Sequence, residues 1–209
     1  MKAEEGASMD TNRLEAFSDG VMAIAITLLV LEISVPSLQG ARDGTLGSAL
    51  VELWPSYVAY VVSFLVIGAI WINHHAMFRY IARADGVLIL LNVLQLMLIA
   101  FLPFPTAVLA ESFSQGVDER LAAAFYAFTL TLLGILINLM WRHAARECHL
   151  LAEHLTRAEV LRIGRRYLVG PIVYAVATLV ALIVPWLAVL LFFLANVFYL
   201  WPRKDTKPA

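Results

Sequence analysis

Long apolar segments without charge, separated by short polar ones, make up most of this chain. No Asp, Glu, Lys or Arg occurs in residues 86–110, 121–141 or 167–202. An apolar run of about 20 residues is long enough to cross a bilayer as a helix. Only a helix satisfies all of its own backbone groups within such a segment in lipid. The pattern therefore predicts an all-α, polytopic membrane protein.

We expect six membrane-spanning helices in a single domain of residues 1–209. The last uncharged run is too long for one crossing and has Pro185 at its centre, so we divide it into two short spans joined by a tight hairpin. Proline also ends the first span at Pro36 and begins the second at Pro55. The sequence LPFP at 102–105 predicts a bend or frayed end in the third. The expected spans are residues 14–35, 55–75, 86–109, 121–141, 167–184 and 186–201.

The distribution of Lys and Arg gives the orientation. With six spans and a cytoplasmic N-terminus, 13 of the 15 Lys and Arg residues lie on the cytoplasmic side, and only Arg42 and Arg120 lie outside. Treating the final run as one crossing would move Arg203, Lys204 and Lys207 to the outer side. The pattern predicts cytoplasmic N- and C-termini and a multi-pass protein of the cell membrane. The net charge of −1 indicates no nucleic-acid partner.

Polar residues interrupt three of the expected spans at one depth. They are Arg13, Ser18 and Asp19 at the inner end of the first span, His74 and His75 at the end of the second, and Asn92 in the third. A charged side chain within a span is costly and usually has a partner. One interpretation is a structural network that locks three helices together. The other is a gate or proton-sensitive element in which a histidine titrates near neutral pH. We expect no metal site, because adjacent histidines on a helix point about 100° apart.

The outer part of the first span carries one helical stripe. Its members recur at intervals of three and four residues and are Gly20, Ile24, Thr27, Leu28 and Leu31. The helix is apolar on every side, so periodicity alone leaves open whether the stripe packs against other helices, faces lipid or lines a pore. Glu32 follows at the outer end. Repeated by symmetry it would form a ring of carboxylates that attracts cations, and alone it is a solvated helix end.

Two motifs resemble the transmembrane protein 175 family of potassium channels. The first is RxxxFSDGVMAIAITLLVLEI, which begins at Arg13. The second is WxxHHxxF, which begins at Trp71 and is followed by Asp85 and LNVLQLMLIAFLPFPT. Met22 departs from the family pattern, which often has an aromatic residue at this position. The motifs cover the first half of the chain, and the second half is similar only in hydropathy and in the number of spans.

The resemblance implies a potassium-permeable channel and no enzymatic activity. In the family, bacterial chains have six spans and assemble as homotetramers, and the first span lines the pore. The pore residues implied here are Ile24, Thr27, Leu28 and Leu31, with Glu32 at the mouth. Ile24 is the expected narrowest point, where four side chains around an axis would close the pore by excluding water. The six polar residues named above would form the interhelical network that positions the pore helix.

The expected partners are the lipid bilayer, other copies of the chain and permeant monovalent cations, with no cofactor. The alternative function is a proton-coupled secondary transporter that uses Asp19 and His74. The sequence shows no internal repeat or broken helix of the kind that transporters use. A membrane enzyme is disfavoured because the sequence has no HExxH, GxSxG or paired intramembrane Asp. A non-conducting scaffold is the remaining alternative.

Overall fold

The computed structural model describes residues 9–36 and 44–200, and these ranges are mostly helical. Outside them lie the acidic N-terminus, Arg42, the expected end of the sixth span at Trp201 and the basic residues at 203, 204 and 207. Five helical segments of the described part are long and apolar enough to cross a membrane: Thr11–Glu32, Trp54–Phe78, Gly86–Gln115, Glu119–Arg146 and Arg157–Ala181. A shorter apolar helix covers Pro185–Asn196. The chain is therefore a polytopic helical membrane protein.

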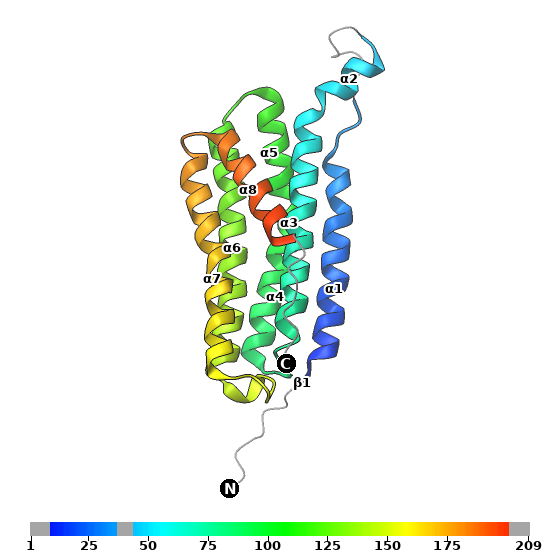
Figure 1. Ribbon diagram of the computed structural model, residues 1–209. Coiled ribbons are helices and arrows are strands. Elements are labelled where there is room, and N and C mark those ends of the chain that lie inside the picture. Colours follow the sequence, from blue (N-terminus) through cyan, green and yellow to red (C-terminus); the bar gives the residue numbers. More distant parts are fainter. Residues whose placement is uncertain (1–8, 37–43, 201–209) are drawn as a thin grey trace.

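The long helices lie side by side in one bundle (Figure 1). The bundle contains α1 (Thr11–Leu28), α3 (Trp54–Phe78), α4 (Gly86–Phe101), α5 (Pro103–Gln115), α6 (Glu119–Arg146), α7 (Arg157–Ala181) and α8 (Pro185–Leu200). The short helix α2 (Leu46–Glu52) lies beyond one end of the bundle, before α3 (Figure 1). The 3-10 turns η1 (Leu29–Glu32) and η2 (Cys148–Leu150) follow α1 and α6. Figure 1 shows α1 at one edge of the bundle and α7 at the opposite edge, with α3, α4 and α6 between them. We call the end at which α1 begins the lower end.

Two helices extend beyond the expected spans for identifiable local reasons. α7 begins at Arg157 because Thr156 and Glu159 form a capping box, in which each side chain accepts a hydrogen bond from the other residue's backbone N–H. Residues 157–166, which precede the fifth expected span, are thus helical and continuous with it. The third expected span is interrupted at Leu102 and continues as α5, whose first residue is Pro103. A proline is tolerated at the start of a helix, where its missing N–H has no intrahelical partner.

A buried polar contact joins α3, α5 and α6 in the upper half of the bundle. The Ser63 hydroxyl lies 2.8 Å from that of Thr106 and 2.9 Å from that of Tyr126. Thr106 also donates to the Leu102 carbonyl at 2.8 Å. Each of the three buried hydroxyls therefore has a hydrogen-bond partner. The contact positions α5 against α3 and α6 despite the break in the third span.

Backbone hydrogen bonds tie three chain segments together at the lower end. The strand β1 (Met9–Asp10) immediately precedes α1 and pairs antiparallel with β2 (Arg83–Ala84) in the connection between α3 and α4. The same connection reaches the segment after α6, because the Ala82 N–H donates to the Leu150 carbonyl at 2.8 Å. The lower end of α1 is thereby linked to both connections.

Asp85 strengthens this end of the bundle. One carboxylate oxygen caps α4 by accepting from the Leu88 N–H at 2.8 Å, and the other lies 2.8 Å from His143 Nε2 of α6. Partial burial opposes the charged form of Asp85, but the hydrogen bonds from Leu88 and His143 outweigh that effect and lower its pKa below the ordinary 3.8.

Candidate pore helix and its polar anchor

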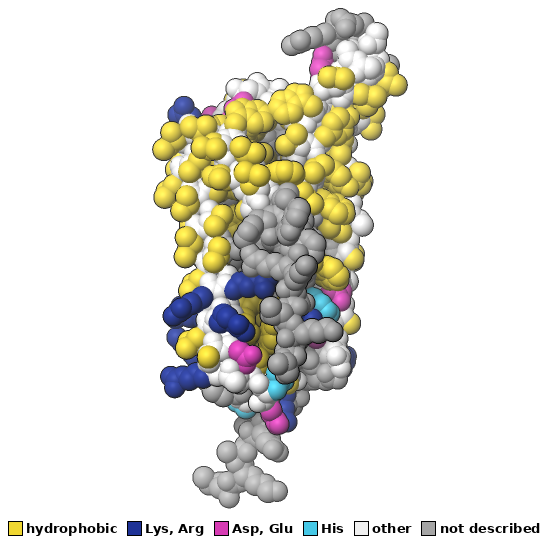
Figure 2. Space-filling model, in the orientation of Figure 1, with side chains coloured by type: hydrophobic (Ala, Val, Ile, Leu, Met, Phe, Trp, Pro, Cys, Tyr) yellow, Lys and Arg dark blue, Asp and Glu magenta, His cyan; other side chains and the backbone are white. Residues whose placement is uncertain are grey.

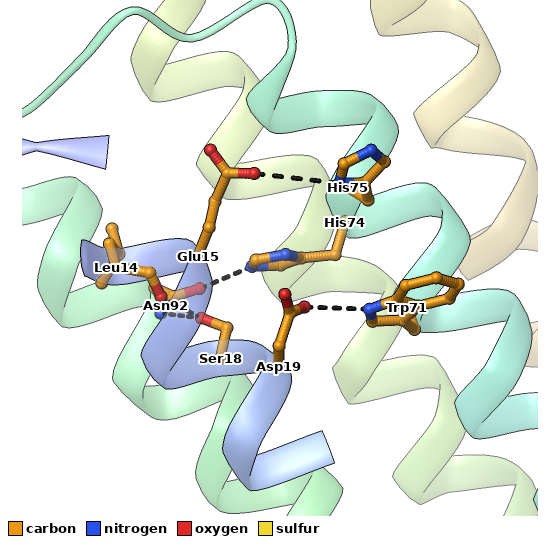
Figure 3. A network of polar contacts seen from close by, with 8 residues as sticks. All are labelled: Leu14, Glu15, Ser18, Asp19, Trp71, His74, His75 and Asn92. Atoms are coloured by element: carbon orange, nitrogen blue, oxygen red, sulfur yellow. Dashed lines mark hydrogen bonds and ion pairs between the residues drawn. The ribbon is translucent and has the colours of Figure 1, made fainter. Parts of the chain in front are cut away.

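A buried hydrogen-bonded chain links α1, α3 and α4 near the lower end (Figure 3). The Asn92 amide nitrogen donates to the Ser18 hydroxyl at 2.9 Å, and the Asn92 amide oxygen lies 2.8 Å from His74 Nε2. Because an amide oxygen only accepts, His74 Nε2 is the donor. Ser18 donates in turn to the Leu14 carbonyl of its own helix at 2.8 Å. Three of the predicted polar residues are thus brought together and satisfied within the bundle.

Two further contacts lie on the exposed side of the same helices. Asp19 accepts a hydrogen bond from the Trp71 indole N–H at 2.9 Å, and His75 Nδ1 lies 3.8 Å from a Glu15 carboxylate oxygen. His74 is buried and His75 is exposed, so it is His74 that faces the bundle. Glu15 was not among the predicted site residues. Its spacing of four from Asp19, opposite the same spacing between Trp71 and His75, is the signal that indicates this double contact.

Arg13 is not brought into this network. Its side chain is exposed and forms no hydrogen bond or ion pair with any residue in the part of the chain that the structure describes. The same part contains no group of three His, Cys, Asp or Glu side chains placed as metal ligands.

The two faces of α1 have different surroundings. One face is buried against α3 and α4 and carries Leu14, Ser18, Met22 and Ala25. The opposite face carries the predicted stripe, and the other helices of the subunit leave it uncovered: the exposed fraction is 62% at Ile24, 41% at Leu28 and 73% at Leu31. Thr27 is exposed with them.

Thr27 and Met22 lie on opposite faces of α1 and have correspondingly different environments. The Thr27 hydroxyl donates to the Ile24 carbonyl at 2.8 Å, which leaves its oxygen lone pairs available on the exposed face. Met22 is only 2% exposed and belongs to the buried face, so its departure from the family pattern concerns packing between helices.

Glu32 lies at the upper end of α1, at the rim of a large cavity. The cavity has a volume of ≈ 860 Å³ between η1, α5 and α6, and its lining includes Leu31, Glu111 and Asp118 as well as Glu32. Acidic side chains from three segments therefore surround the space next to the last residue of the stripe.

Comparison with known proteins identifies the family. A family model described as the endosomal/lysosomal potassium channel TMEM175 matches residues 13–103. A potassium channel of Chamaesiphon minutus is 45% identical over 190 residues, which are 91% of this chain and 93% of the relative. This chain belongs to the TMEM175 family. The similarity extends into the second half of the chain, where the two motifs did not reach.

Two further comparisons support membership in the TMEM175 family. A potassium channel of Streptomyces collinus is 50% identical over 141 residues, which are 68% of each chain. The crystal structure of a lysosomal potassium-selective channel TMEM175 homolog from Chamaesiphon minutus superposes with a TM-score of 0.81 at 43% identity, covering 90% of this chain and 95% of that one. The family expected from the two sequence motifs is confirmed.

Proposed function

We propose that this chain forms a potassium-permeable cation channel in which α1 of each subunit lines the pore. The observation that carries the proposal is the uncovered stripe on α1, where Ile24, Leu28 and Leu31 remain exposed although the opposite face is fully packed. TMEM175 relatives that are named potassium channels and match most of this chain support the same function.

The proposed assembly is a homotetramer of six-span subunits. Within one subunit, α1 packs against α3 and α4 at the edge of the bundle, which leaves its stripe free to meet copies of itself. α8 is the proposed sixth span, and its 16 residues are about 24 Å long. Arg79 and Arg83 lie in the connection between α3 and α4, and Arg142 and Arg146 lie at the lower end of α6, so we assign the lower end to the cytoplasm by the positive-inside rule.

Ion permeation in this arrangement depends on the wetting of an apolar ring. Four Ile24 side chains around an axis close the pore by excluding water, and a small movement of α1 admits it. Above Ile24, the Thr27 hydroxyls replace part of the water that a dehydrating cation loses. Potassium loses water more easily than sodium, so we expect a moderate preference for potassium. Glu32 and the acidic cavity beside it attract cations to the upper mouth.

Flux of potassium into liposomes tests the proposal. Ile24→Asn places a polar group in the ring and should increase potassium flux through purified, reconstituted protein. Ile172→Asn is the matched control, because Ile172 is 59% exposed on α7, at the opposite edge of the bundle, and the chemical change is the same. Wild-type protein without potassium flux, or equal flux in the two variants, would contradict a pore lined by α1.

The same liposomes distinguish the alternative function. A proton-coupled transporter would accumulate potassium against its gradient when a pH gradient is imposed, whereas a channel only equilibrates it. In the structure, Asp19 and His74 have separate partners, Trp71 and Asn92.

A further inference from the structure

The exposed face of α7 changes from apolar to basic along its length. Its upper part presents large apolar side chains at helical spacing: Leu168, Ile172, Val176 and Leu179. Its lower part presents Arg157, Arg162, Arg165 and Arg166, all of them exposed. Figure 2 shows the same boundary, with Lys and Arg side chains gathered over the lower part of this edge and apolar ones above. Such a change marks the depth at which the acyl chains meet the headgroups.

A narrow groove begins at this boundary and runs upward between α3, α6 and α7. It encloses ≈ 50 Å³, and its lower end is polar, lined by Arg166, Asn73 and Tyr167. The Tyr167 hydroxyl donates to the Asn73 carbonyl at 3.4 Å, which fixes α7 against α3 at this point. Above that end the groove is apolar. Its wall includes Ile70, Ile137, Gly170 and Pro171.

The groove places a pair of arginines next to an apolar wall. Arg166 and Arg162 are one helical turn apart and therefore project on the same side of α7. Guanidinium groups bind phosphate oxygens through paired charge-assisted hydrogen bonds. The apolar wall above them offers a surface against which an acyl chain can lie, although the ≈ 50 Å³ groove does not enclose a whole chain. A free anion in water would use the arginines alone, and only a molecule with both a headgroup and a chain uses the whole groove.

We propose that this groove binds one anionic phospholipid, with its phosphate on Arg166 and Arg162 and one acyl chain along the apolar wall. The other two exposed arginines of α7, Arg157 and Arg165, add positive charge around the headgroup, so a lipid with a net negative charge binds more tightly than a zwitterionic one. The lipid would contact α3, α6 and α7, which all contribute to the lining of the groove. The proposal does not depend on ion conduction.

Lipid binding to the purified full-length protein tests this site. The number of bound lipids is measured by native mass spectrometry while phosphatidylglycerol, or phosphatidylcholine with the same chains, is titrated into delipidated protein. We expect tighter binding of phosphatidylglycerol. Arg166→Gln should weaken that binding by about tenfold or more, the effect of losing a charge-assisted hydrogen bond. Arg165→Gln is the matched control, because Arg165 carries the same charge one residue away and does not line the groove. It should weaken binding by no more than about fivefold.

A second variant and a competitor separate the chain from the headgroup. Gly170→Leu fills the apolar wall without changing the charge and should also weaken binding of phosphatidylglycerol. Glycerol phosphate, which has the headgroup chemistry without chains, should not compete at the same concentration. Equal losses in Arg165→Gln and Arg166→Gln, equal binding of the two lipids, or competition by glycerol phosphate would each overturn the proposal. Arg166→Gln keeps the test valid if the Gly170 variant does not fold.

Discussion

Replacing Asn92 with leucine tests whether the buried polar chain stabilises the subunit. Asn92 is completely buried and bridges Ser18 of α1 and His74 of α3 at 2.9 and 2.8 Å. Leucine has nearly the same shape and no polar atoms, so the change removes both hydrogen bonds without leaving a large cavity. Ser18 retains its bond to the Leu14 carbonyl, but His74 loses its hydrogen-bond partner.

The loss in the free energy of unfolding can be estimated in two ways. A buried group left without its partner costs about 1–3 kcal/mol, and this cost applies to His74. Hydrogen bonds between membrane helices contribute about 0.6 kcal/mol on average and up to about 1.7, so two bonds give about 1–3 kcal/mol. The two estimates agree, and we expect Asn92→Leu to lower the free energy of unfolding by about 2 kcal/mol.

Gln95 provides the control on the same helix. It is also completely buried, less than one turn above Asn92, but neither atom of its amide group has a hydrogen-bond partner among the described residues. Gln95→Met therefore breaks no bond between helices, and we expect unchanged or increased stability. Melting in detergent, followed by tryptophan fluorescence, should show a decrease of about 4–8 °C for Asn92→Leu and none for Gln95→Met. Equal melting of Asn92→Leu and wild type, or a larger decrease for Gln95→Met, would refute the reasoning.

Two further changes probe the lower end and the contact between α6 and α7. The pKa of Asp85 is lowered by folding, so its pair with His143 stabilises the protein above about pH 4, and this contribution is lost as the pH falls through the lowered pKa. Asp85→Asn should lower the melting temperature at neutral pH, by an amount equivalent to about 1 kcal/mol for a partly exposed pair. The difference should shrink as the pH falls below about 4 and vanish only below the lowered pKa of Asp85; a difference independent of pH would contradict this assignment. A Cβ at Gly134 would lie 3.0 Å from the backbone nitrogen of Pro171, whereas one at Gly68 of α3 meets nothing within 4 Å. Gly134→Ala should therefore cost about 1–3 kcal/mol in thermal unfolding and Gly68→Ala should not, and equal melting of the two would contradict a tight contact between α6 and α7 at this position.

Hydropathy predicted the helical membrane architecture because lipid imposes one strong rule, that every backbone group in a span must be satisfied locally. The polar network could also be predicted, because polar side chains are rare within spans that face lipid. Ser18, His74 and Asn92 are conspicuous in apolar spans, and the structure brings all three together. The bond from Trp71 to Asp19 could not be predicted in this way, because an indole at a span end is equally suited to the membrane interface.

Other features leave no sequence signal at all. The strands β1 and β2 have two residues each, which is too short for an alternating pattern. Their pairing, which holds the start of α1, is therefore visible only in the structure. Arg13 is placed differently from the expectation within one subunit. A charge next to a polar cluster was expected to join it, but Arg13 lies five residues before Ser18, so it projects from a different side of the helix and is exposed in the subunit. In the proposed channel, the role of the α1 stripe depends on neighbouring subunits, and no pattern within one chain specifies them.

In the proposed channel, the position of the polar anchor explains why the gate lies at Ile24. The bonds at Ser18 and the pairing of β1 hold the lower end of α1, whereas its upper part contacts the bundle through apolar packing. Movement of α1 is then a pivot near Ser18. Ile24 is about 9 Å above that point along the helix, so a tilt of about 10° moves each Ile24 outward by about 1.6 Å. The opening across the axis widens by about 3 Å, roughly one water molecule, which is enough to wet an apolar ring. A gate below Ser18 would have to break buried hydrogen bonds to open. Ile24→Asn wets the ring without any tilt, so a silent Ile24→Asn variant would contradict this geometry as well.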